Sequence, residues 1–516
     1  MLIQVNAAKC VGTQAVQVIV ETKIDHGIGI HLVGLVDVAV KESLLRTTTA
    51  LTSIGFRIPG KKIIINLAPA DMRKNGSGYD LPIAVGILAA SGKYVFETVS
   101  DYFIMGELSL DAALRPIDGA IPYAELAERL GLKGMILPRE SAREAAEIVE
   151  MPVYGVDSLT DVIRILEGKD GCEDLRMHPE GLRAALPRKS SGMDLSEIVG
   201  QDEAKRALEI AAAGGHNLLM IGSPGSGKSS LAKALPGILP PLTRGEAVET
   251  SRIYSAAGLL KGHGGLVRER PFRSPHHSSS MSAIIGGGNG GAIMPGEITL
   301  AHNGVLFLDE VAQMSGSILE ALRAPLEDRC VTISRMSGKL TFPASFMLVA
   351  ASNPCPCGYF GEGDRCRCTP MQRDSYLKRL SGPVMDRIDL QVWVHGVSPE
   401  RLRSARKGES SAAVAARVLK ARRLQEKRFL GEGISVNAEM NNRQMERFCP
   451  LDEGSRESLE KLVSKSGMSL RAWFRIIKVA RTIADLEGSE RITAAHLMEA
   501  AGFRLLDKGG GGRQTP

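Results

Sequence analysis

Residues 222–229, Gly-Ser-Pro-Gly-Ser-Gly-Lys-Ser, constrain the fold of this chain more than any other segment does. They fit the pattern G-x-x-x-x-G-K-[ST] and lie between an apolar run over 217–221 and a helical pattern over 228–234. In such a loop the glycines let backbone N–H groups curve around phosphates, while the lysine places its charge on the outer phosphate oxygens. A glycine-rich turn with an incidental lysine would not need this strand and this helix around it. The sequence therefore predicts an α/β domain that binds ATP with Mg²⁺.

A second apolar run, over residues 304–308, ends in two carboxylates, Asp309 and Glu310. At the carboxyl end of a buried strand, Asp309 is expected to hold Mg²⁺ with Ser229, and Glu310 to polarise the attacking water. Asn353 follows a further apolar strand and is expected to orient that water. The alternative for each is an ordinary strand end or turn residue. The residues expected to bind the nucleotide and its Mg²⁺ are Gly222, Ser223, Pro224, Gly225, Ser226, Gly227, Lys228, Ser229, Ser230 and Asp309.

Arg387 lies in a segment, 380–390, that is expected to form a loop before a strand. An arginine presented there resembles a finger that reaches the γ-phosphate of a neighbouring subunit and stabilises charge in the transition state. A surface arginine is the alternative. If the finger is real, the enzyme works only as a ring.

The chain has 516 residues, which is too long for one hydrophobic core and suggests about three domains. Its net charge of +6 permits a polyanionic partner without requiring one. Residues 1–20 lack the pattern of a secretion signal, and the longest apolar runs fall short of a bilayer span, so we expect a cytoplasmic protein with no membrane partner. We expect a multidomain α/β chain with an α/β or α+β domain over 1–168, a linker over 169–193, the nucleotide-binding core over 194–396, an all-α lid over 397–507 and a disordered tail over 508–516.

The core is expected to carry an insert. Lys228 and Asp309 lie 81 positions apart, which is long for one helix and one strand. Residues 243–300 must therefore contain extra structure, and the glycines over 286–291 suit flexible loops.

Four of the eight cysteines are packed between positions 355 and 368 as two C-x-C pairs. Eight residues separate the pairs, enough chain to bring four thiolates to one tetrahedral zinc ion. The spacing is tighter than the usual C-x-x-C, so free reduced thiols and a redox switch remain alternatives. The candidate metal ligands are Cys355, Cys357, Cys366 and Cys368.

At these residues the chain resembles the YifB/ComM family of magnesium-chelatase-like AAA+ proteins. The segments that carry the resemblance, besides the two nucleotide motifs, are 270–277, 286–288, 295–298, 300–310, 353–358 and 480–486. The resemblance implies a Lon-protease-like N-terminal domain, an AAA+ core, a C-terminal helical lid and a hexameric ring. It also implies that Arg471 is the second sensor arginine, with a surface arginine as the alternative.

In the resembling ATPases the insert carries a hairpin and pore-facing loops. On that basis a phosphate backbone in the channel could contact Arg268, Arg270, Arg273, His276 and His277. A solvated basic loop is the alternative. Residues 400–428, with ten basic residues and three acidic ones, leave the same two alternatives of DNA contact or a solvated face.

The N-terminal domain lacks the residues that proteolysis needs. Residues 73–80 resemble the Lon segment that carries the nucleophilic serine, but that position is Gly78. Tyr123 occupies the position of the activating lysine, and Ser77 is one residue out of register. We therefore expect this domain to be a scaffold for ring assembly or substrate binding.

Two functions from different classes fit such a ring. The family resemblance implies a hexamer on single-stranded or branched DNA that drives branch migration as a helicase, in homologous recombination and natural transformation. The alternative is a magnesium-chelatase-type ATPase that remodels a protein partner for metal insertion. The Lon-like domain and the cysteine pairs favour the first.

Overall fold

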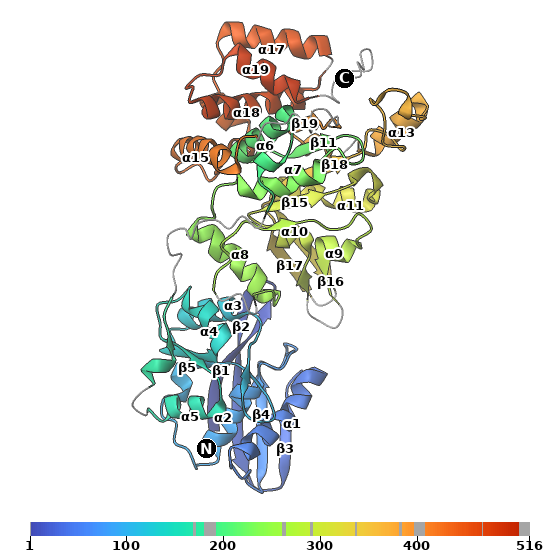
Figure 1. Ribbon diagram of the computed structural model, residues 1–516. Helices are drawn as coiled ribbons and strands as arrows, with labels where there is room; N and C mark the ends of the chain where they lie inside the picture. Colours follow the sequence, from blue (N-terminus) through green and yellow to red (C-terminus); the bar gives the residue numbers. More distant parts are fainter. Residues whose placement is uncertain are drawn as a thin grey trace.

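The computed structural model describes residues 2–168, 172–179, 192–260, 265–288, 293–335, 338–380, 384–396, 408–466 and 468–504. Three regions follow one another along the long axis of the molecule (Figure 1). An N-terminal region with a mixed sheet lies at one end, a region with a parallel sheet lies in the middle, and a helical region lies at the other end. The predicted multidomain α/β class is confirmed at this level.

The N-terminal region is built on an eight-stranded mixed sheet. Its strands, in sheet order, are β10 (Arg176–Met177), β9 (Val153–Val156), β8 (Gly134–Pro138), β5 (Tyr102–Ile104), β1 (Leu2–Val11), β2 (Gln14–Asp25), β4 (Lys62–Ala68) and β3 (Gly29–Val33). Side chains on β2 alternate between core and solvent, so that Val18 and Val20 are fully buried. The short hairpin of β6 (Glu107–Leu108) and β7 (Leu114–Arg115) lies outside this sheet.

Five helices complete the N-terminal region. They are α1 (Val38–Ser53), α2 (Asp80–Ala90), α3 (Ala120–Arg129), α4 (Arg139–Ala146) and α5 (Leu159–Leu166). Asp37 begins α1 by accepting a hydrogen bond from the backbone N–H of Val40. Helix α2 is apolar on all sides and its residues 80–89 are buried, because it packs against β1, β2 and α1.

The linker predicted over 169–193 is only partly separate from this region. Arg176 and Met177 pair with Tyr154 and Val153 at the edge of the sheet, so the chain still belongs to the first core there. This strand has only two residues and no alternating pattern by which it could have been recognised. Residues 169–171 and 180–191 lie outside the described part.

The central region is a five-stranded sheet in which every neighbouring pair is parallel. Its order is β12 (Phe272–Arg273), β15 (Val305–Leu308), β18 (Met347–Ser352), β11 (Leu218–Ile221) and β19 (Leu390–Trp393). Strands β11, β15 and β18 are buried along their whole length, as expected when helices cover both faces of a parallel sheet. Since the strands are parallel, the residues after β11, β15 and β18 come together at the carboxyl ends of the strands.

The extra structure predicted over 243–300 is present. It comprises α8 (Arg244–Ala256), strand β12, α9 (Met281–Ile285), the hairpin of β13 (Gly286–Gly287) and β14 (Met294–Pro295), and α10 (Glu297–Leu300). A second hairpin, β16 (Cys330–Arg335) with β17 (Gly338–Pro343), was not predicted. This hairpin points toward the N-terminal region (Figure 1), and a Cβ at Gly12 in the β1–β2 turn would lie 3.7 Å from Leu340 Cδ1 and Phe342 Cε1.

The N-terminal region and the core meet through α3 and α8. The backbone N–H of Gly119 donates to the carbonyl of Ser255 at 2.9 Å, and the Ser255 hydroxyl donates to Glu144 Oε2 at 2.9 Å. Arg252 and Glu125 form an ion pair between the same helices. Ser255 and Glu144 are both buried, so this junction is part of the folded interior.

The C-terminal region is helical, as predicted. Its helices are α15 (Ser411–Arg428), α16 (Asn442–Phe448), α17 (Glu453–Ser466), α18 (Leu470–Glu487) and α19 (Ala494–Gly502). Helix α6 (Asp202–Gly214) of the core packs against α15 and α18, and one hydrophobic cluster spans both regions. Residues 397–407 of the predicted lid and the tail over 508–516 lie outside the described residues. Among the described helices, none is long and apolar enough to cross a membrane.

Candidate active site

The phosphate loop joins β11 to α7 (Lys228–Ala234), as the motif predicts. Gly225 and Gly227 have φ angles of +79° and +97°, in the left-handed region that glycine adopts at no steric cost. Gly227 immediately precedes α7, so the loop ends at the positive end of a helix. This local structure can surround phosphate oxygens with backbone N–H groups.

Lys228 is held inside the loop. Its Nζ donates to the carbonyls of Gly222 at 2.7 Å and Ser223 at 2.8 Å, and it lies 3.4 Å from Asn353 Oδ1. Burial lowers the pKa of Lys228, while the charge of Asp309 opposes this shift. Asn353, which is expected to orient the attacking water, therefore lies beside Lys228.

Ser229 and Asp309 lie together where Mg²⁺ is expected. The Ser229 hydroxyl donates to Asp309 Oδ2 at 2.9 Å, and Asp309 Oδ1 accepts from the backbone N–H of Glu310 at 2.9 Å. A serine hydroxyl and a carboxylate are oxygen ligands of the kind that Mg²⁺ prefers. The donor set fits this ion.

Glu310 is in contact with a residue that the sequence did not connect to it. Its φ is +49°, and its Oε2 lies 3.2 Å from His277 Nδ1. His277 follows β12, which pairs with β15, the strand that leads to Glu310. The His276 ring lies beside it with centroids 4.1 Å apart. His277, which the sequence left between DNA contact and a solvated loop, therefore contacts the carboxylate that is expected to polarise water.

Two arginines of the insert also have partners within the chain. Arg270 pairs with Glu246 and donates to the carbonyl of Asn303 at 2.7 Å. Arg273 makes two hydrogen bonds to Glu297, at 2.6 and 2.7 Å. Both ion pairs join residues of the insert to each other, so each arginine has a structural role within the chain, whichever of DNA contact and a solvated basic loop applies to this segment.

Helix α15 similarly uses several of its basic residues internally. Arg417 pairs with Glu209, Arg422 donates to the carbonyl of Ala212 at 2.8 Å, and Arg428 pairs with Asp485. Lys420, Arg423 and Lys427 are exposed on this helix, and Arg417 is exposed too although it is ion-paired.

Gln201 contacts the phosphate loop from the segment before α6. Asp194, where the predicted core begins, caps a short 3-10 turn, and α6 begins only at Asp202. Gln201 lies between them with a φ of +60°, and its Nε2 donates to the carbonyl of Ser226 at 3.1 Å. The Gly200–Gln201 step, where the helical pattern is interrupted, is the only signal in the sequence for this turn.

Arg387 and Arg471 lie together at the opposite end of the sheet, at the amino ends of its strands. Both line a cavity of about 310 Å³, beside Asn217 and Asp389, which precede β11 and β19. The phosphate loop follows β11, and a strand of four residues spans about 13 Å. Burial and the neighbouring cations, including Arg323, lower the pKa of Arg387.

Carboxylates hold both arginines at the amino ends of the strands. Arg387 pairs with Glu327, and Arg471 pairs with Asp386. Neither arginine is brought to the phosphate loop of its own chain.

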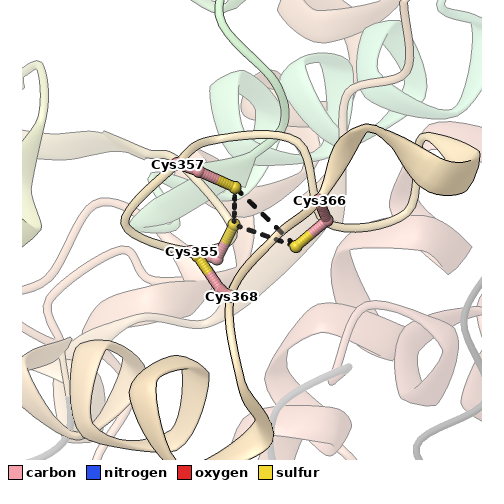
Figure 2. A group of neighbouring side chains, drawn as sticks. All are labelled: Cys355, Cys357, Cys366 and Cys368. Atoms are coloured by element: carbon pink, nitrogen blue, oxygen red, sulfur yellow. Dashed lines mark hydrogen bonds between the residues drawn. The ribbon is translucent and has the colours of Figure 1, made fainter.

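The four clustered cysteines converge on one point (Figure 2), and their sulfur atoms all lie within 4.8 Å of one another. Cys355 Sγ is 3.3 Å from Cys357 Sγ and 3.8 Å from Cys366 Sγ. Thiolates around zinc at about 2.3 Å lie about 3.8 Å apart in a tetrahedron, so the arrangement fits this ion. All eight cysteines are free thiols. A backbone hydrogen bond near Tyr359 lowers the pKa of Cys357 to about 6, whereas burial raises that of Cys355 to about 12.

The positions of the missing protease dyad are enclosed by packed side chains. A Cβ at Gly78 would lie 3.0 Å from Met105 Cε, and the Tyr123 ring packs 5.6 Å from that of Phe103. Burial raises the pKa of Tyr123 well above its ordinary value. The hydroxyl of Ser77, which is one residue out of register with the Lon serine, donates to Glu107.

Comparisons with known proteins cover nearly the whole chain. The family model "Magnesium chelatase, subunit ChlI" matches residues 194–402, "Subunit ChlI of Mg-chelatase" matches 20–141, and "Magnesium chelatase, subunit ChlI C-terminal" matches 408–504. The uncharacterized protein YifB of Salmonella typhimurium is 43% identical, over 98% of this chain and 97% of its own. Competence protein ComM of Haemophilus influenzae is 43% identical over 96% of each chain. The chain belongs to the YifB/ComM family of magnesium-chelatase-like proteins. YifB of Escherichia coli has the same 43% identity, over 98% of this chain.

Membership of the YifB/ComM family gives the phosphate loop its chemistry, because this is a family of magnesium-chelatase-type ATPases. The model for residues 194–402 includes the loop, Asp309, Glu310, Asn353 and Arg387. The cysteine cluster of this family member lies inside the same range, directly after Asn353.

Proposed function

We propose that this YifB/ComM family member is a hexameric, ATP-driven motor that moves on single-stranded or branched DNA. In this role it promotes branch migration, with helicase activity, in homologous recombination and natural transformation. The observation that supports a ring is the placement of Arg387 and Arg471 at the amino ends of the core strands, whereas the phosphate loop lies at their carboxyl ends. Its relative ComM is named a competence protein, which supports a role connected with DNA uptake.

In the proposed mechanism one subunit supplies most of the catalytic groups. The loop around Lys228 holds the β- and γ-phosphates of ATP, and Ser229 with Asp309 holds Mg²⁺, which neutralises phosphate charge. Glu310 polarises the attacking water, and Asn353, whose Oδ1 lies 3.4 Å from Lys228 Nζ, orients it.

The neighbouring subunit supplies the remaining charges. Its Arg387 and Arg471 stabilise the negative charge that develops on the transferred phosphoryl group. Their place in the fold supports this role, since about one strand length separates them from the phosphate loop of their own chain. Hydrolysis then requires contact between subunits, which in a head-to-tail arrangement closes into a ring.

The proposal includes one structural zinc ion bound by the four clustered cysteines, because their sulfur distances fit a tetrahedral site. It also assigns the N-terminal region to ring assembly or substrate binding. This region is a Lon-like scaffold in which Gly78 and Tyr123 stand in place of the catalytic dyad. Its buried junction with α8 supports a mechanical link to the motor.

A magnesium-chelatase-type ATPase that remodels a protein partner is the second candidate. The descriptions of all three matching family models favour it. One of these models covers residues 20–141, so the N-terminal region does not by itself separate the two functions, contrary to our expectation from the sequence.

DNA-dependent ATP hydrolysis separates the two candidates. We expect forked or four-way DNA to bind the purified protein and raise its ATPase rate several-fold. Bound DNA should shift the subunits toward the conformation that hydrolyses ATP. Glu310→Gln is expected to bind the same DNA without turnover. If the wild-type protein neither binds DNA nor responds to it, the DNA-motor proposal fails and the chelatase-type role becomes the better account.

A further inference from the structure

The cysteine loop, residues 354–369, contacts the phosphate loop at two adjacent residues. The Ser223 hydroxyl donates to the carboxylate of Glu362, and Gly358 packs against the ring of Pro224. Glu362 and Gly358 both lie within 358–365, the segment between the two cysteine pairs. The stretch that a bound metal would close is therefore the stretch that contacts the nucleotide site.

Gly358 brings the backbone of the cysteine loop against Pro224. Its φ is +84°, and a Cβ at this position would lie 2.8 Å from Pro224 Cδ and 2.9 Å from Pro224 Cγ. A residue with a side chain would push the two loops apart. The backbone of the cysteine loop thus packs directly against the phosphate loop at Pro224.

Glu362 acts on the acceptor that holds the catalytic lysine. The carbonyl of Ser223 accepts from Lys228 Nζ at 2.8 Å, and the hydroxyl of the same serine is bound by Glu362. A second path leads through Asn353, which lies near Lys228 and only two residues before Cys355. The cysteine loop therefore reaches the lysine's partners by two paths, a hydrogen bond to Ser223 and the short chain connection to Asn353.

This loop has one regular element, the 3-10 turn Gly363–Arg365, which has no buried residue. Its buried residues are Pro354, Cys355 and Gly358, and an exposed ion pair joins Arg365 to Glu362. A metal that ties Cys357 to Cys366 closes the eight residues between them and fixes their backbone. Without such a tie, the contacts of this segment alone must offset the conformational entropy that its ordering costs.

We propose that zinc bound by the four cysteines fixes the phosphate loop through Glu362 and Gly358, so that nucleotide affinity depends on the metal. This inference rests on the zinc site in the proposed function. It is independent of DNA, since both contacts lie within one subunit.

The first test removes the metal from the full-length protein. In the double variant Cys366→Ser, Cys368→Ser, we expect zinc measured by elemental analysis to fall from one equivalent per chain to nearly none. The Kd for a fluorescent ATP analogue with Mg²⁺ should weaken about tenfold, since a charged loop contact is lost. Hydrogen exchange of the amides over 222–229 should become faster.

The second test leaves the zinc site intact. Glu362→Ala should keep its zinc and still weaken nucleotide binding several-fold. Asp364→Ala, which removes an exposed acid from the same loop, is the matched control and should bind nucleotide as the wild type does. Added to Glu362→Ala, the two cysteine substitutions should weaken binding less than they do alone, because the two changes break the same path.

The possible failures can be told apart. Wild-type protein without zinc would refute both the metal site and the coupling. Zinc at one equivalent, with unchanged nucleotide affinity in the folded cysteine variant, would refute the coupling alone. If the cysteine variant does not fold, wild-type affinity in zinc-bound Glu362→Ala would refute it. The DNA-dependent ATPase measurement tests the motor separately.

Discussion

At the scale of single residues, the motif positions were predictable and their long-range partners were not. Lys228, Ser229 and Asp309 meet as the spacing predicts, because a phosphate loop and a strand-end carboxylate recur in this geometry. Glu362 contacts Ser223 across 139 positions, and His277 reaches Glu310 from another strand. No local pattern encodes these pairs, since each depends on how distant segments pack.

The residue-scale prediction concerns Lys228. We expect Lys228→Ala to weaken binding of ATP with Mg²⁺ about 10- to 100-fold and to abolish turnover, because it removes a buried charge aimed at the phosphates. Isothermal titration and an ATPase assay measure the two effects. Lys233→Ala, an exposed lysine of the same helix, is the control and should change neither. Retained turnover in Lys228→Ala would contradict the assigned site.

At the scale of secondary structure, long periodic segments were predictable and short pairings were not. The apolar run over 217–221 and the helical pattern over 228–234 appear as β11 and α7, and the predicted all-α region contains α15 to α19. Strand β10 and the β16–β17 hairpin were missed, the first because it has two residues. Their existence depends on a neighbouring strand, which the sequence around them does not show.

One element-scale prediction concerns the junction between the sheet and the lid. Asp389, before β19, lies 3.4 Å from His216 Nδ1 and 3.1 Å from Arg475 Nη1, and His216 Nε2 lies 2.8 Å from Thr482 Oγ1 on α18. Asp389→Asn should lower the free energy of unfolding by about 3 kcal/mol, because it leaves buried charge without its partner. Chemical denaturation measures this. Asp328→Asn, at an exposed acid, should change it by less than about 0.5 kcal/mol.

The same carboxylate makes a prediction about pH. Burial would raise the pKa of Asp389, but the hydrogen bond to His216 and the charge of Arg475 outweigh it, so the pKa lies below its ordinary value. A depressed pKa in the folded state stabilises the protein above the unfolded value of about 3.9, and this contribution is lost as pH falls below it. Between about pH 5 and pH 3, Asp389→Asn should therefore lose less stability than the wild type does.

At the scale of the whole molecule, the sequence predicted three regions. It did not predict how the catalytic groups are divided between the carboxyl and amino ends of the core strands. That division follows from the strand order, in which β18 lies between β15 and β11, and from all strands being parallel. Strand order depends on packing of segments that are distant in the chain. The resemblance implied a ring, and the positions of Arg387 and Arg471 supply the geometric support for one.

The central claim is that a neighbouring subunit completes each ATP site, and mixing two inactive variants tests it most directly. Arg387→Ala subunits keep their own Glu310, while Glu310→Gln subunits still offer Arg387 to a neighbour. In an equal random mixture about a quarter of the interfaces combine both intact groups, so ATP hydrolysis should reappear and depend on the mixing ratio. The contrary result is an ATPase rate that stays at the level of the separate variants at every ratio.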